Sequence, residues 1–120
     1  VTLYNMGLTL HCDGVKAGNS SSLKKALDLY EMAIAVLDED DCGSSLEFHT
    51  LLCLAASNNI RCIHSHFFDV EETQFYRSLM KLAIAETEST TVLNTNDFAF
   101  FAINVTLLSP DQELSLAPAA

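Results

Sequence analysis

Residues 23–37 read LKKALDLYEMAIAVL, and this stretch decides the fold class. Its apolar residues recur at intervals of three and four, the spacing of one face of an α-helix: Leu23, Ala26, Leu27, Tyr30, Ala33, Ile34 and Leu37. The charged residues Lys24, Lys25, Asp28 and Glu31 fall on the other side. A turn-prone run at 18–22 precedes the helix, and carboxylates at 38–41 oppose the negative end of its dipole. The sequence therefore predicts an amphipathic helix that ends near Leu37.

Further helices are predicted on both sides of this one. Segment 3–12 is apolar at helical spacing and is followed by Asp13-Gly14, where glycine can adopt the left-handed conformation that ends a helix. Two patterns resemble capping boxes and predict helices over about 46–67 and 70–86: Ser44-x-x-Glu47 and Asp69-x-x-Glu72. The chain is thus expected to be all-α, with about five helices that form stacked antiparallel hairpins.

The last predicted helix covers residues 97–108 and is closed by Pro110. One apolar stripe suffices to bury it on the hairpins: Phe98, Phe101, Val105 and Leu108. A second stripe consists of Phe100, Ile103 and Leu107. Either further repeats, a second copy of the chain or another protein cover this second stripe, or the tail at 109–120 shields it with Leu114 and Leu116. We expect a single domain over 1–108 and a C-terminal tail over 109–120.

The composition excludes several classes of partner. The chain has 120 residues, 49% of them apolar, and its 6 basic and 16 acidic residues give a net charge of −10. Nucleic acid and anionic membrane surfaces are therefore poor partners. The longest apolar stretch, 98–108, is about half of what a transmembrane helix needs, so no membrane span is predicted. Four cysteines without a Cys-x-x-Cys pair favour a soluble protein of a reducing, intracellular compartment.

Two motifs carry a resemblance to a known family. Leu3-x-x-Met6-Gly7-x-x-Leu10 and Ala26-x-x-x-Tyr30-x-x-Ala33 resemble the first and second helices of a tetratricopeptide repeat (TPR). The resemblance implies that Gly7 and Ala26 lie where two helices approach closely, and that Tyr30 fills the space toward the next helix pair. An echo of asparagines at Asn5, Asn59 and Asn104 marks the first helices of successive pairs.

A second resemblance is narrower. Asn58-Asn59-Ile60, the residues 63–67 and the ending Ala117-Pro118-Ala119-Ala120 resemble a divergent group of TPR-like proteins that is numerous in diatoms. No biochemical role follows from this resemblance.

Metal and catalytic chemistry find little support in the sequence. His49-x-x-x-Cys53 and Cys62-x-x-x-His66 each place two ligand types on one helix face, but the two pairs point about 220° apart around one helix. A calcium loop that starts at Asp38 would place histidine at its twelfth position, where glutamate is required. No nucleophile turn or glycine-rich phosphate loop is present. We therefore expect no catalytic residue, no cofactor and no metal.

The sequence predicts a non-enzymatic protein–protein interaction module, or an accessory subunit of a larger assembly. The resemblance implies a concave contact face lined by Tyr4, Leu8, His11, Asn58, Cys62 and Ser65. The second stripe of the last helix offers a separate contact surface, made of Phe100, Ile103 and Leu107. None of the first six is basic, which argues against capture of acidic peptide tails. One alternative is a structural subunit fixed permanently in a large complex, organellar and membrane-associated complexes included. A small metal-binding protein or an enzyme is a further alternative. The sequence does not identify the partner, the compartment or the oligomeric state, and self-association is one of the open alternatives.

Overall fold

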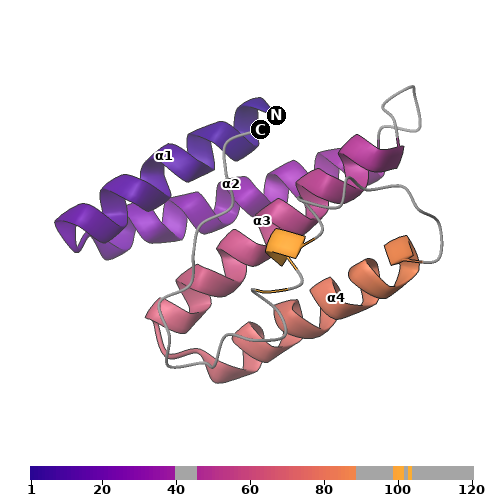
Figure 1. The fold of residues 1–120 in the computed structure, drawn as a ribbon. Helices are drawn as coiled ribbons and strands as arrows, with labels where there is room; N and C mark the ends of the chain where they lie inside the picture. The colour runs from indigo at the N-terminus through magenta and orange to yellow at the C-terminus, as the bar shows by residue number, and fades with distance from the viewer. Residues whose placement is uncertain (40–45, 89–98, 102, 104–120) are drawn as a thin grey trace.

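The computed structural model describes residues 1–39, 46–88, 99–101 and 103. Most of these residues lie in four long helices (Figure 1). They are α1 (Thr2–Ala17), α2 (Ser20–Glu39), α3 (Leu46–His66) and α4 (Val70–Glu88). α1 pairs with α2, α3 pairs with α4, and the two hairpins stack through α2 and α3. The prediction of an all-α fold of stacked helical hairpins is confirmed. Residues 99–101 and 103 are also helical, and the rest of the predicted helix 97–108 and the tail lie outside the described residues.

The first hairpin is held by a close approach of α1 to α2. A Cβ atom added to Gly7 would lie 3.0 Å from the ring of Tyr30 and 3.3 Å from the carbonyl oxygen of Ala26. Every residue of the predicted apolar stripe of α2 is buried or half-buried, and Tyr30 is fully enclosed. The predicted contact between Gly7 and Ala26 and the packing of Tyr30 are therefore confirmed.

The end of α1 differs from the prediction. The helix does not stop at Gly14, which lies in its last turns, where an added Cβ atom would lie 2.8 Å from the side chain of Leu23. Gly18 ends the helix instead, with φ at 61° in the left-handed region. Gly14 is thus a packing glycine, because a side chain there would collide with α2.

The two hairpins turn in the same way, 50 residues apart. After α1, Asn19 N–H donates to the Gly14 carbonyl and the Asn19 side chain caps α2. After α3, Asp69 N–H donates to the His64 carbonyl and the Asp69 carboxylate caps α4. Gly18 and Phe68 are the left-handed residues of the two turns. This motif satisfies the last carbonyls of the first helix and the first amides of the second.

The same 50-residue offset relates the inward faces of the two hairpins. Seven positions that are buried in the first hairpin have buried or half-buried counterparts in the second: Tyr4, Gly7, His11, Leu23, Ala26, Tyr30 and Ala33 correspond to Leu54, Ser57, Arg61, Thr73, Tyr76, Met80 and Ala83. The asparagine echo is therefore not the structural register, because Asn5 and Asn59 are 54 residues apart and lie in different environments, half-buried and fully buried.

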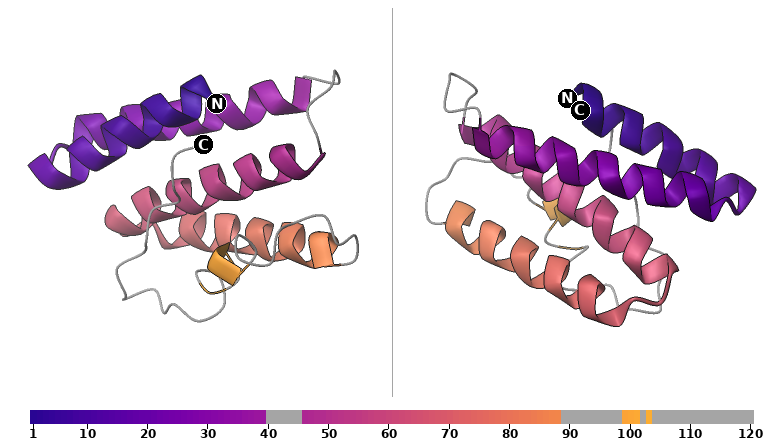
Figure 2. Two further views of the ribbon diagram at one scale, coloured as in Figure 1. Left: turned by 45° about the horizontal axis from the view of Figure 1, so that its top comes forward. Right: turned by 180° about the vertical axis from the view of Figure 1, so that it is seen from behind.

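α3 is the central helix of the molecule (Figures 1 and 2). It lies between α2 and α4, and residues 54–61 are all buried. Its neighbours therefore cover most of its circumference, which explains why its sequence shows no clean polar face.

We expect Tyr30→Ala to lower the free energy of unfolding by on the order of 3 kcal/mol, because it leaves a large cavity between α1, α2 and α3. Thermal or urea unfolding measures this effect. Asp28→Ala on the exposed face of α2 is the control, and an equally small loss for both variants would contradict the packing of Tyr30.

Replacing Phe68 with glycine should stabilise the protein. The backbone of Phe68 has φ at 58°, a left-handed conformation that is unfavourable for any residue with a side chain. The side chain is 89% exposed, so its removal costs little packing. We expect a gain of about 1 kcal/mol in Phe68→Gly, measured by thermal unfolding. Gln74→Gly, at an exposed position inside α4, is the control and should be destabilised.

Candidate protein-docking groove

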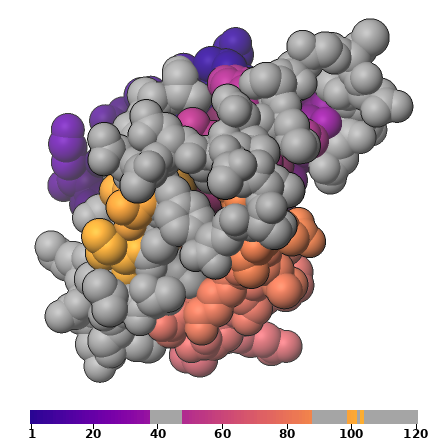
Figure 3. Space-filling model, turned by 45° about the vertical axis from the view of Figure 1, so that its right-hand side comes forward, coloured from indigo at the N-terminus to yellow at the C-terminus, as the bar shows by residue number. Residues whose placement is uncertain are grey.

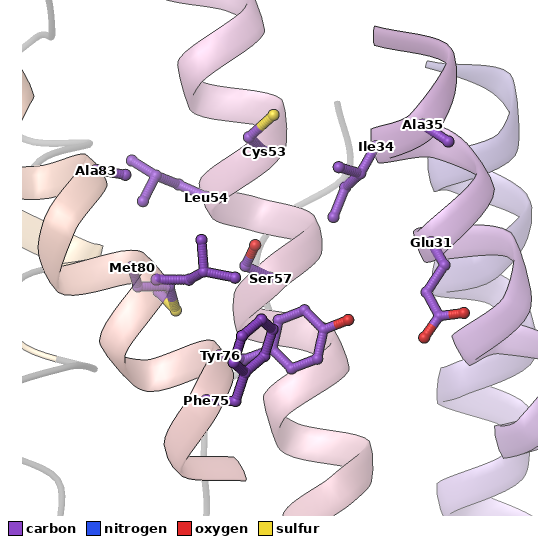
Figure 4. Close-up of a pocket in the computed structure, with 11 residues that line it drawn as sticks. Glu31, Ile34, Ala35, Cys53, Leu54, Ser57, Phe75, Tyr76, Met80 and Ala83 are labelled. Carbon is purple, nitrogen blue, oxygen red and sulfur yellow. The ribbon is translucent and has the colours of Figure 1, made fainter. Parts of the chain in front are cut away.

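An apolar groove of about 450 Å³ lies between α2 and α4, with α3 as its floor (Figure 4). It forms because α2 and α4 both pack on α3 while their backbones stay apart in the described part of the chain. Eleven residues line the groove: Glu31, Ile34 and Ala35 from α2, Cys53, Leu54 and Ser57 from α3, and Phe75, Tyr76, Leu79, Met80 and Ala83 from α4. We call this feature the docking groove.

The walls of the docking groove are open to solvent. Phe75 is 55% exposed and Leu79 is 41% exposed, whereas Leu54 and Met80 below them are buried. Exposed large apolar side chains that gather around a concave surface commonly mark a site that another molecule covers. The groove therefore has the character of a contact site for an apolar ligand surface.

Tyr76 is the main polar residue of the groove, and contacts from α3 hold it in place. Its ring stacks on the His64 imidazole, with ring centroids 5.9 Å apart and an interplanar angle of 15°. His64 Nδ1 in turn lies 3.3 Å from Asp69 Oδ2 in the α3–α4 turn. Figure 4 shows the Tyr76 hydroxyl pointing across the groove toward Glu31.

The electrostatic environment of Tyr76 is negative. Burial raises the pKa of the Tyr76 hydroxyl, and the charges of Glu31 and Glu72 raise it further. The hydroxyl therefore stays protonated and can donate a hydrogen bond. Glu31 belongs to α2 and Glu72 belongs to α4, so each of the two helices beside the groove contributes one of these carboxylates.

A second polar cluster is buried between α1, α2 and α3. The side-chain amide of Asn59 donates to the Tyr4 hydroxyl at 3.1 Å and to the Tyr30 hydroxyl at 3.3 Å. The His11 Nδ1 atom lies 3.4 Å from the Tyr30 hydroxyl. Asn58 continues the cluster, because its amide donates to Asn59 Oδ1 and its own oxygen accepts from Arg61. This cluster joins the two hairpins, so its role in the described structure is to fix how they stack.

Three titratable groups of this cluster, Tyr4, Tyr30 and His11, are neutral at neutral pH because burial disfavours their charged forms. Burial raises the pKa of Tyr4 to about 12 and raises the pKa of Tyr30 as well. Burial also lowers the pKa of His11 to about 4, and the charge of His66 lowers it further. The three groups are hydrogen-bonded structural residues at neutral pH.

The residues predicted to form a contact face are divided between the interior and the surface. Tyr4, His11 and Asn58 are 0–2% exposed, so they are interior residues and present no surface to a partner. The prediction followed the TPR resemblance, in which the first helices of the pairs line a concave face. Here Tyr4 and Asn58 hydrogen-bond to Asn59, and His11 lies against the Tyr30 hydroxyl, in the interior. Leu8, Cys62 and Ser65 are half-buried. Their role in protein contact stays a prediction.

The last predicted helix is described at four residues. Phe101 is 3% exposed and belongs to the core, and Phe100 packs against that core. Ile103 is 49% exposed, as expected for the second stripe, and these residues are partly visible at the surface in Figure 3. Leu107 lies outside the described residues.

The docking groove was not foreseen from the sequence. Its floor and walls come from three helices, and helical spacing predicts the face of each helix but not the gap between two of them. A signal was available in α4, where the apolar residues at 75, 76, 79, 80 and 83 form a broader face than one neighbouring helix can cover.

Other kinds of site were sought in the described part of the chain. There, no three His, Cys, Asp or Glu side chains converge in a way that could bind a metal ion. Among the described residues, Cys12, Cys53 and Cys62 form no disulfide bond, and burial raises the pKa of Cys62 to about 12. None of the described helices combines the length and the apolarity that crossing a bilayer requires. Comparison with protein-family models, curated proteins and solved structures finds no match to this chain.

The buried His11 gives folding stability a defined pH dependence. The pKa of His11 is near 6.5 in the unfolded chain and about 4 in the folded protein. Between pH 6.5 and pH 4, His11 is therefore protonated in the unfolded state but not in the folded state. Stability is therefore full above pH 6.5 and falls as the pH drops toward 4, by up to about 3 kcal/mol.

Urea unfolding at several pH values measures this effect. His11→Phe removes the titrating group, so the variant should lose less stability than the wild type between pH 7 and pH 5. Equal losses in the two proteins would contradict a buried, neutral His11.

Proposed function

We propose that this protein is a small helical-repeat interaction module, TPR-like in its organisation, that binds a helical segment of another protein in the docking groove. The observation that carries the proposal is the groove itself, an apolar concave surface that α2 and α4 leave open over α3. An amphipathic helix that lies in a groove between two helices is a recurrent mode of protein recognition.

The shape of the apolar surface favours a protein segment over a small molecule. Phe75 and Leu79 are one helical turn apart on α4, and both line the groove while much of each side chain faces solvent. A ligand confined to the cavity would leave this outer wall exposed. A helix lying along the groove would cover the floor and the wall together.

The repeat organisation also supports an interaction role. The two hairpins share their turn geometry and their inward-facing positions at an offset of 50 residues. In addition to the α2–α3 packing, α1 contacts α3, so the first helices of the two pairs are neighbours. Stacked helix pairs of this kind build extended binding surfaces in repeat proteins. The TPR-like character of the chain is part of the proposal and rests on this arrangement and on the motifs around Gly7 and Tyr30.

A second candidate function is a subunit fixed permanently in a large complex. The observation in its favour is Ile103, which is 49% exposed although Phe101, two residues earlier, is in the core. A fixed subunit would occur with its partner in constant stoichiometry, whereas a module that binds through the groove would exchange partners.

The experiment is affinity capture from an extract of the source cells with the wild type and two variants. Leu79→Gln adds a polar group to the groove wall, and Leu82→Gln makes the same change on α4 outside the groove, where the side chain is 66% exposed. We expect Leu79→Gln to lose the bound protein and Leu82→Gln to retain it, with little change in melting temperature for either. Equal retention by both variants, or a partner in constant stoichiometry with all three proteins, would contradict binding in the groove.

A further inference from the structure

The docking groove has carboxylates along both walls. On α2, Glu31 lines the groove, and Asp28 lies one turn earlier on the same face. On α4, Glu72 and Glu86 lie seven residues before and after Leu79, which places them near the same face of the helix. The charges of Glu31 and Glu72 both act on the Tyr76 hydroxyl inside the groove. The two walls therefore expose a negative potential to whatever enters.

Basic side chains are mostly directed elsewhere. No lysine or arginine lines the groove. On α4, Arg77 and Lys81 are two residues from Leu79 and lie about 160° around the helix from it, and neither lines the groove. Lys24 shares a face of α2 with Glu31 but lies two turns earlier, beyond the lining residues. The charge asymmetry thus belongs to the groove as well as to the whole chain, whose net charge is −10.

This charge argues against an occupant from the same chain. All six basic residues lie in the four helices α1–α4, and the sequence at 40–45 and 89–120 contains none. The apolar segment 98–108 is flanked by the acidic residues Asp97, Asp111 and Glu113. A tail or a last helix from this or a second copy would bring like charges together, which costs affinity.

The geometry points to a basic amphipathic helix from another protein as the occupant of the docking groove. Its apolar side chains would cover Leu54, Met80 and the outer wall at Leu79, and lysine or arginine on its flanks would pair with Glu31 and Glu72. The Tyr76 hydroxyl would donate a hydrogen bond to a polar group of the same segment. This inference rests on the proposed function and adds the chemistry of the partner to it.

Two designed peptides test the charge requirement. Both form an amphipathic helix of about 18 residues with the same leucine face, and one carries lysines on its flanks where the other carries glutamates. Fluorescence anisotropy measures their affinity for the full chain. We expect the lysine peptide to bind at least about tenfold more tightly, and this preference to shrink at 1 M salt.

Charge reversal on the protein locates the effect. Glu31→Lys should weaken binding of the lysine peptide about tenfold and strengthen binding of the glutamate peptide. Asp13→Lys makes the same change in net charge on an exposed position of α1 and should change either affinity less than about threefold. Equal effects of the two substitutions would overturn the inference, because the preference would then follow net charge alone.

The remaining outcomes also separate the inference from the proposed function. If both peptides bind equally and Leu79→Gln weakens both, the groove binds helices but the charge inference is wrong. If neither peptide binds and Leu79→Gln also leaves affinity capture unchanged, the proposed function fails as well. If sedimentation shows a dimer that Leu79→Gln dissociates, a second copy occupies the groove and the inference is overturned.

Discussion

The side-chain amide of Asn59 holds the hydroxyls of Tyr4 and Tyr30 at 3.1 and 3.3 Å, and the stacking of the two hairpins depends on this contact. The three residues belong to α3, α1 and α2 and are fully buried. A buried amide without partners would be costly, so other rotations of α3 against the first hairpin are disfavoured. Because the contact sets the rotation of α3, it also decides which face of α3 remains for α4.

The groove follows from that rotation. Leu54 and Ser57 lie on α3 between its two neighbours, and the 50-residue offset places Ser57 where the first hairpin has Gly7. In the first hairpin, Tyr30 fills the space over Gly7 and reaches the next helix. The counterpart of Tyr30 in the second hairpin is Met80, which is buried at the base of the α4 wall and is a flexible side chain suited to irregular surfaces. The two hairpins therefore differ in residue type at these positions: Gly7 and Tyr30 leave no space in the first hairpin, whereas Ser57 and Met80 line the groove in the second.

Much of the fold could be predicted from the sequence because the helices carry their own apolar period, and α4 also carries its own cap. These features each involve residues of a single hairpin: the apolar stripe of α2 and the approach of Gly7 to Tyr30 in the first, and the Asp69 cap of α4 in the second. The site could not be predicted in the same way. Asn59 is 55 residues from Tyr4 and 29 from Tyr30, so helical spacing carries no sign that these polar groups satisfy one another. The same limit made Gly14 look like a helix end, because only the position of Leu23 shows that it is a packing contact.

The separation of a buried polar cluster from an exposed apolar groove has a physical consequence for recognition. A hydrogen-bonded core specifies one arrangement of helices, and a fixed arrangement keeps α2 and α4 apart, so a bound helix finds its groove already formed. Under the proposed function, affinity for a helix would come from covering Phe75 and Leu79, whereas selection among helices would come from carboxylates such as Glu31 that remain near solvent and lose little hydration. Charge at the rim changes which partners associate and how fast, and apolar area on the floor and wall determines how long they stay. If the proposal holds, an acidic protein with an apolar groove between carboxylates on two helices would discriminate against its own acidic segments by the same interaction that would attract a basic partner.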